Sequence, residues 1–114
     1  MADAPAEPPT AEALVNSLPN RFRPDKAENW SATFHLQLKG AGTPDWTVRV
    51  NDGACTVEEG MEGAPDCLVR MKADTYVAIE TGRLNPQTAF MTGRVRVSDL
   101  AQMVKFGKAF RPFE

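Results

Sequence analysis

Apolar and polar positions alternate without interruption between residues 30 and 39. The even-numbered positions are apolar and the odd-numbered ones are polar, which predicts a β-strand with one buried face and one wet face. The same period of two returns in residues 46–51, and the Asn-Asp-Gly sequence at 51–53 is typical of a tight turn. A third strand follows with Cys55 and Val57 on its inner face, so the first half predicts an antiparallel three-stranded meander.

Two further strands are predicted in the second half of the chain. Residues 60–66 contain two glycines and a proline, so we expect a connecting loop there. Alternation resumes over residues 67–72, which predicts the fourth strand. A fifth strand opens at Gly93, with Val95 and Val97 on its inner face.

Helices are predicted from capping residues and from apolar residues at helical spacing. We expect them from Thr10 to a stop at Pro19, from Pro24 to about Glu28, from Asp74 to Gly82, from Asn85 to about Met91, and from Asp99 to Phe110. With the two helices before the first strand taken together, the element order is α-β-β-β-β-α-α-β-α. This order predicts an α+β fold with a five-stranded, mostly antiparallel sheet covered on one face by helices.

Length and composition fit one domain. The chain has 114 residues, and residues 1–9, with three prolines and no periodicity, predict a disordered leader before a domain at 10–114. A net charge of −2 argues against a nucleic-acid partner. No apolar run could cross a bilayer and no secretory signal is recognisable, so we expect a cytoplasmic protein in which Cys55 and Cys67 are reduced thiols.

No group of residues predicts catalysis. The single histidine, His35, falls on the polar face of the first strand, where we expect a surface imidazole, and no carboxylate is within sequence reach to orient it. Two cysteines and one histidine at these spacings do not form a zinc site. Glycines are scattered between elements and form no phosphate-binding loop. We therefore predict no catalytic residues, no metal and no cofactor.

The outward face of the predicted sheet is strongly basic. Six cations fall on it and Glu58 is the clear acid among them: Lys39, Arg49, Arg70, Lys72, Arg94 and Arg96. An ordinary solvated surface explains this pattern. The alternative, which the sequence favours less but leaves open, is an attraction to anionic lipid headgroups or to an acidic partner. For the second case, the membrane-facing set is Arg49, Arg70, Lys72, Arg94 and Arg96.

The segment Gly82-Arg-Leu-Asn-Pro-Gln-Thr-Ala-Phe-Met-Thr-Gly-Arg-Val-Arg-Val97 resembles the sterol carrier protein lipid-transfer domain family. The resemblance extends over about residues 14–110 and includes Phe34 to Gly40, Trp46 and the Asp52-Gly53 turn. It implies a sheet and helices with an apolar tunnel between them, and binding or transfer of fatty acids, acyl-CoA esters, phospholipids or sterols. The chain lacks the peroxisomal tripeptide of eukaryotic relatives, which is typical of a stand-alone bacterial member.

The sequence departs from the family after the fifth strand. The family usually has a Gly-Asp pair there, whereas this chain goes directly from Ser98 to Asp99, which affects the position of the last helix and the size of the tunnel. Phe and Met, which re-pack around irregular guests, gather on the late helices. The residues expected to contact lipid are Phe34, Leu36, Val57, Met71, Phe90, Met91, Met103, Phe106 and Phe110.

A lipid pocket has a consequence for stability. An empty cavity of ~300 Å³ costs about 7 kcal/mol, which is comparable with the stability of a whole domain. The pocket must therefore be filled, or its helical wall must collapse when it is empty. The leading hypothesis is a non-catalytic lipid binder, monomeric or weakly dimeric. The alternatives are an interaction or dimerisation module that uses the same apolar groove and, less favoured, a small enzyme acting on a lipid-like substrate.

Overall fold

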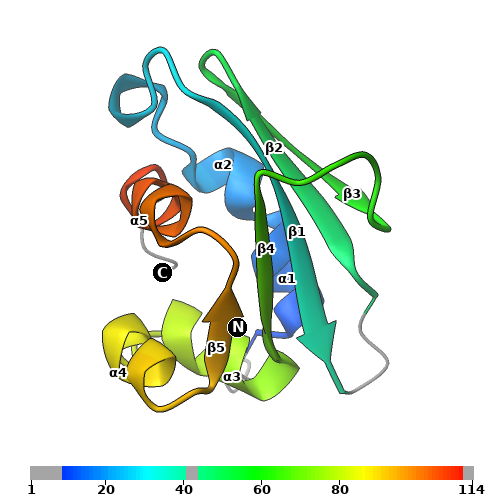
Figure 1. The fold of residues 1–114 in the computed structure, drawn as a ribbon, viewed down its shortest axis with the longest axis vertical. Coiled ribbons are helices and arrows are strands. Elements are labelled where there is room, and N and C mark those ends of the chain that lie inside the picture. Colours follow the sequence, from blue (N-terminus) through cyan, green and yellow to red (C-terminus); the bar gives the residue numbers. More distant parts are fainter. Residues whose placement is uncertain (1–8, 41–43, 112–114) are drawn as a thin grey trace, which may run out of the picture.

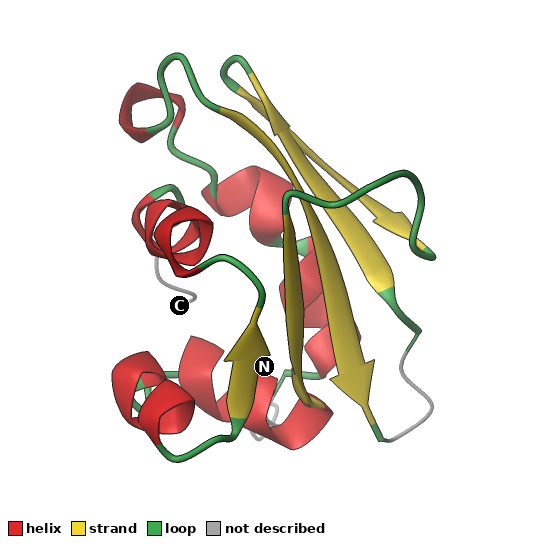
Figure 2. Ribbon diagram, viewed as in Figure 1, coloured by secondary structure: helices red, strands yellow, loops and turns green. Residues whose placement is uncertain are grey.

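The computed structural model describes residues 9–40 and 44–111, and it contains one five-stranded sheet with helices gathered on one side (Figures 1 and 2). The strands are β1 (Ser31–Lys39), β2 (Trp46–Asn51), β3 (Ala54–Glu59), β4 (Cys67–Lys72) and β5 (Val95–Val97). The helices are α1 (Ala11–Asn16), α2 (Leu18–Arg21), α3 (Ala73–Glu80), α4 (Pro86–Met91) and α5 (Leu100–Lys108), with a 3-10 turn η1 (Pro24–Lys26). Except for Pro9, the expected leader lies outside the described residues.

The sheet has the order β3-β2-β1-β4-β5 and is mixed. β2 pairs antiparallel with β1 and β3, β5 pairs antiparallel with β4, and β4 runs parallel to β1. The predicted α+β architecture with a mostly antiparallel sheet is therefore confirmed. The turn between β2 and β3 has positive φ at both Asp52 (46°) and Gly53 (88°), as two-residue hairpins of this twist require.

The loop between β3 and β4 covers part of the outward face of the sheet, and this corrects the prediction for His35. That residue is only 6% exposed, and its Nε2 lies 3.0 Å from the carbonyl oxygen of Glu62. Beside it, the hydroxyl of Thr47 donates to the Gly60 carbonyl (2.6 Å) and accepts from the Glu62 N–H (3.0 Å). Alternation placed His35 on the correct face, but it carried no information about the loop that folds over that face.

The helix starts are largely as predicted. Thr10, Asn85 and Asp99 accept hydrogen bonds from the first turns of α1, α4 and α5. Pro19 does not end the first helical segment, because α2 begins at Leu18 with the proline in its first turn, where no N–H is needed. Asp74 is not a cap either: it lies within the first turn of α3.

The helix expected from Pro24 to about Glu28 is instead the shorter 3-10 turn η1. Among the described residues, the longest helices, α3 and α5, have eight and nine residues, and no helix is long and apolar enough to cross a bilayer.

Candidate functional site

A row of aromatic rings runs from the sheet across α5 to the N-terminal segment. Phe34 of β1 meets Phe106 of α5 with ring centroids 4.7 Å apart, and Phe106 meets Phe110 at the same distance. The ring of Phe110 in turn lies 5.5 Å from that of Phe22, and the rings of Trp30 and Phe34 lie 5.9 Å apart. Three residues that the sequence assigned to lipid contact are therefore brought together across two layers of the molecule.

Helix α5 is attached to the body by one side only. None of its residues is buried, and Met103 and Phe106 are partly buried where they pack against the core. At its start, the indole N–H of Trp30 donates to Gln102 Oε1 (2.9 Å), and the Cys67 thiol donates to the Asp99 carbonyl (3.5 Å). α5 is thus a wall held by a single stripe of side chains.

The chain after α5 is fastened to the segment after α2. Phe110 and Phe22 form an antiparallel bridge. The Arg23 N–H donates to the Ala109 carbonyl, and the Arg111 N–H donates to the Arg21 carbonyl, both at 2.7 Å. These backbone bonds fix the end of the wall to the N-terminal helices.

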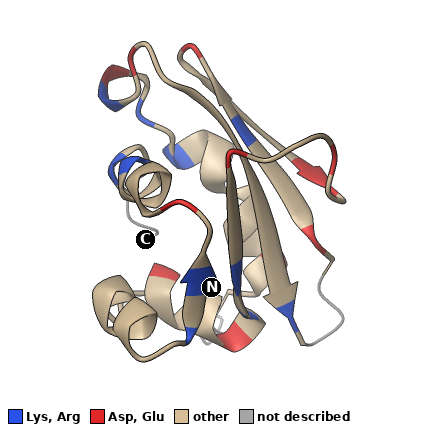
Figure 3. Ribbon diagram, in the orientation of Figure 1, with Lys and Arg blue, Asp and Glu red and all other residues tan. Residues whose placement is uncertain are grey.

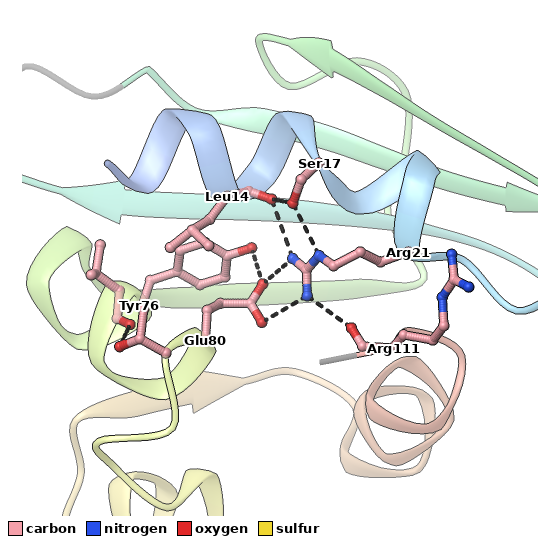
Figure 4. Close-up of polar contacts among 8 residues, drawn as sticks. Leu14, Ser17, Arg21, Tyr76, Glu80 and Arg111 are labelled. Atoms are coloured by element: carbon pink, nitrogen blue, oxygen red, sulfur yellow. Dashed lines mark hydrogen bonds and ion pairs between the residues drawn. The ribbon is translucent and has the colours of Figure 1, made fainter. Parts of the chain in front are cut away.

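A buried polar network lies next to this junction (Figure 4). The guanidinium of Arg21, a residue 8% exposed, forms an ion pair with Glu80 of α3 at 2.8 Å. It also donates to Ser17 Oγ (3.0 Å), to the Leu14 carbonyl (3.3 Å) and to the Arg111 carbonyl (3.0 Å). One side chain therefore connects α1, α3 and the segment after α5.

Tyr76 completes the network by donating its hydroxyl to Glu80 Oε2 at 2.6 Å. Burial, followed by the negative charge of Glu80, raises the pKa of Tyr76 well above its usual value of 10. The sequence analysis missed this network. A signal was present, because Leu14, Leu18 and Arg21 follow helical spacing, which places the arginine on the apolar stripe.

The other predicted lipid-contact residues fall into two groups. Leu36 and Met71 are buried in the sheet, 5% and 6% exposed, and Val57 is partly buried on β3. On α4, by contrast, Phe90 is 40% exposed and Met91 is 82% exposed. The structure therefore places these two side chains at the surface rather than in the aromatic row.

Hollows on the described part of the molecule include two that are lined by none of the aromatic row's residues. One of about 540 Å³ is lined by Pro24, Asp25, Glu28, Asn29, Asp52 and Gly53. The other, of about 260 Å³, is lined by Lys39, Gly40, Lys72, Ala73 and Asp74. No predicted lipid-contact residue lines either hollow. Between β1 and α5, ring-to-ring contacts fill the space, as expected where an empty cavity would be costly.

The basic residues of the sheet divide between its two halves. Arg49 of β2 forms an ion pair with Glu58 of β3 at 3.0 Å. Arg70 of β4 lies directly opposite Arg96 of β5 in the strand pairing, and its Nε donates to Gln37 Oε1 (2.8 Å). Figure 3 shows Lys and Arg on β4 and β5 and again on α5. Like charges placed opposite each other destabilise a sheet, so Arg70 and Arg96 do not stabilise the β4–β5 pairing through their charges.

The family model and the curated relatives that match this chain point to the same family. The model of the SCP-2 sterol transfer family matches residues 13–111. "Sterol carrier protein 2" of Gallus gallus is 34% identical over 68 residues, which cover 57% of this chain and 12% of the relative. The chain thus spans about an eighth of the length of that curated relative.

Solved structures share the fold. Palmitated SCP2L2 from Aedes aegypti aligns with a TM-score of 0.70 at 19% identity, covering 91% of this chain and 96% of that one. The sec-alkylsulfatase Pisa1 from Pseudomonas sp. aligns with a TM-score of 0.79 at 21% identity, covering 93% of this chain but only 17% of the enzyme. At these identities the likeness shows the fold alone.

Proposed function

Because the chain belongs to the SCP-2 sterol transfer family, we propose that it binds the apolar part of a lipid between its sheet and α5, and carries it without catalysis. The observation that supports this most is the aromatic row Phe34–Phe106–Phe110, which joins the sheet to a helix with no buried residue. Separating such a helix from the sheet costs little free energy, whereas separating a helix with several fully buried side chains costs much more.

The sheet supplies the floor of the proposed site and the C-terminal helix its wall. Phe34, Leu36 and Met71 are almost fully buried and form the floor. Met103, Phe106 and Phe110 are partly buried and pack against the core, with Phe106 directly on Phe34. An entering acyl chain would take the place of the contacts between the two groups. The rings would then line the chain instead of each other.

Burial of hydrocarbon supplies the driving force. Each methylene removed from water contributes about 0.8 kcal/mol, so ten methylenes contribute about 8 kcal/mol. That gain offsets the loss of ring contacts, which are worth about 0.5–1.5 kcal/mol per aromatic pair beyond their area. No reacting group is needed, and the residues that matter are apolar. Val57, Phe90 and Met91 would contribute only with longer ligands, since they lie at the edge of the sheet or at the surface.

Two adjacent residues of α5 provide the test. Met103 faces the core and Val104, which is 50% exposed, faces away from it. We expect Met103→Glu to weaken binding of a fluorescent fatty acid at least about tenfold, because it places a carboxylate in the apolar layer. Val104→Glu carries the same charge on the same helix and should bind like the wild type.

Both variants should retain the circular dichroism spectrum of the wild type, since α5 has no buried residue. Equal affinities for the two variants would show that the ligand does not lie under α5. Native mass spectrometry of protein purified from cells gives an independent check, because co-purified lipid of defined mass is expected and lipid-free protein with no affinity for fatty acid would contradict the proposal.

A further inference from the structure

The indole N–H of Trp46 is a buried donor without an acceptor. Trp46 begins β2 and is 1% exposed, and the described residues offer its Nε1 no hydrogen-bond partner. No other buried side-chain nitrogen or oxygen in the described part of the chain is left unbonded. The second tryptophan, Trp30, is also buried, but its Nε1 donates to Gln102. Since buried polar groups are nearly always bonded, the unpaired donor of Trp46 requires an explanation.

Strand pairing places this donor beside the floor of the proposed lipid site. Trp46 lies directly opposite Leu36 of β1, and residues opposite each other in an antiparallel pair lie on the same face of the sheet, with Cβ atoms about 5 Å apart. Leu36 shares that face with Phe34, two residues earlier in the strand. Because Phe34 meets Phe106 of α5, this is the face that the helices cover (Figure 2). The indole thus belongs to the layer in which we propose that the lipid binds.

The neighbours of the indole on this face are apolar. Val48, two residues along β2, is buried, and so are Leu36 and Leu38 of β1. Glu59 lies opposite Trp46 on β3, but its side chain is exposed and accepts no hydrogen bond from the indole. A water molecule at the N–H would need further polar partners, which these aliphatic side chains do not provide. The donor is therefore placed to meet an acceptor that a ligand brings with it.

We propose that Trp46 donates a hydrogen bond to a neutral oxygen, a hydroxyl or a carbonyl, on the hydrocarbon part of the bound lipid. The inference rests on the proposed function, because the acceptor reaches Trp46 only if a lipid enters the layer between sheet and α5. It assigns a class of ligand: a long-chain lipid with one oxygen along its chain. Such a chain follows β1 from Phe34 to Leu36 and there meets the indole.

A neutral oxygen fits this donor better than a carboxylate or a phosphate. The indole supplies one uncharged N–H, whereas an anion buried in an apolar layer needs several donors or an opposite charge. A hydroxyl or a carbonyl is satisfied by a single bond. An ionised headgroup consequently stays in the solvent, while an oxygen further along the chain reaches Trp46. A plain hydrocarbon chain also fills the layer, but it leaves the donor unpaired.

Positional isomers of a hydroxy fatty acid provide the test. Hydroxystearates that differ only in the carbon that carries the hydroxyl have the same size and nearly the same hydrophobicity, so their affinities report where the hydroxyl lies. In competition with a fluorescent fatty acid, we expect one isomer to bind at least about tenfold more tightly than the others, whose hydroxyl is buried without a partner. Equal affinities throughout the series would overturn the proposal.

Two tryptophan variants identify the donor. Trp46→Phe keeps an aromatic ring and removes the N–H, so the affinities of the isomers should converge to within about twofold of one another. Trp30→Phe also removes an indole N–H, but one that is already bonded to Gln102, and it should keep the preference for one isomer. A preference that survives in Trp46→Phe, or that both variants lose, would contradict the role of Trp46.

Proton–nitrogen correlation NMR of the wild type tests the same bond without a substitution. The chain has two tryptophans and hence two indole N–H signals, which their contacts with Leu36 and with Gln102 assign to Trp46 and Trp30. The Trp46 proton should lie further downfield with the preferred hydroxystearate bound than with stearate bound, because a hydrogen bond deshields it. The Trp30 proton should be the same in both complexes. An unchanged Trp46 signal would overturn the proposal.

Failure of this inference can be distinguished from failure of the proposed function. Stearate has no oxygen along its chain, so its binding depends on the apolar layer alone. If stearate binds but the hydroxystearates all bind alike, the role of Trp46 is wrong and the lipid site stands. If the wild type binds neither stearate nor any hydroxystearate, the lipid site is wrong, and this inference fails with it.

Discussion

The N-terminal and C-terminal helices of this protein are both amphipathic, but they are attached to the sheet in different ways. Leu14, Val15 and Leu18 of α1 and α2 are 0–1% exposed, and the buried Arg21–Glu80 ion pair connects these helices to α3. α5 has no buried residue and keeps Leu100 and Val104 in solvent. The first group completes the core, whereas the second closes the layer in which we propose that the lipid binds.

The difference between the two groups of helices bears on the proposed binding of lipid. If every helix were fixed as firmly as α1, the apolar layer could open only by unfolding the domain. If every helix were attached as loosely as α5, the core would not sustain a stable domain of this size. Division of the two tasks between the ends of the chain avoids both problems.

A large loss of stability is expected from removing Arg21, the cation that connects α1 and α2 to α3. Arg21→Met should lower the free energy of unfolding by about 3 kcal/mol, because the largely buried Glu80 carboxylate would lose its ionic partner. Urea denaturation measures this loss. Arg111→Met is the control, because its guanidinium donates to the exposed Asn20 carbonyl and should cost less than about 1 kcal/mol. Similar losses in both variants would show that the network does not hold the helices together.

Substitution of one leucine in α1 and one in α5 allows the contributions of these two helices to stability to be compared directly. Leu14 is 0% exposed and Leu100 is 53% exposed. Leu14→Ala should destabilise the protein by about 2–5 kcal/mol, since it removes transfer energy and leaves a cavity. Leu100→Ala should stay within about 0.5 kcal/mol of the wild type. If thermal and urea unfolding give equal losses, α5 is as much part of the core as α1, and the contrast between the two regions fails.

Alkaline pH should gradually destabilise the folded protein through the ionisation of Tyr76. Because the folded state raises the pKa of Tyr76 above its usual value of 10, the folded protein holds the phenol proton more tightly than the unfolded chain. This contribution to stability is complete below pH 10 and is lost as the pH rises toward the folded pKa. The free energy of unfolding should therefore fall above pH 10, by at most about 1.4 kcal/mol per pH unit.

The chain has one tyrosine, so phenolate absorbance follows Tyr76 alone. Tyr76→Phe should remove this part of the slope. Ordinary titration of the phenol near pH 10 in the folded protein would show that Tyr76 is not buried against Glu80.

Local sequence signals predicted most of the fold. Alternation located all five strands, the turn at Asp52-Gly53 formed the expected hairpin, and Thr10, Asn85 and Asp99 cap helices as expected. These features depend on neighbours within a few residues, so they can be read from one segment at a time. Part of the candidate site follows for the same reason: Phe34 and Phe106 each lie on an apolar stripe, and the two stripes meet.

Only the tertiary structure decided what covers each face. It buried His35 under the β3–β4 loop, paired Arg21 with Glu80 across 59 residues of sequence, and left Phe90 and Met91 of α4 exposed. It also paired β4 with β5, which put Arg70 opposite Arg96, on the other side of β1 from Arg49. Periodicity assigns a side chain to a face of its own element. Whether that face meets a loop, a helix or water depends on packing between distant segments, which no local pattern encodes.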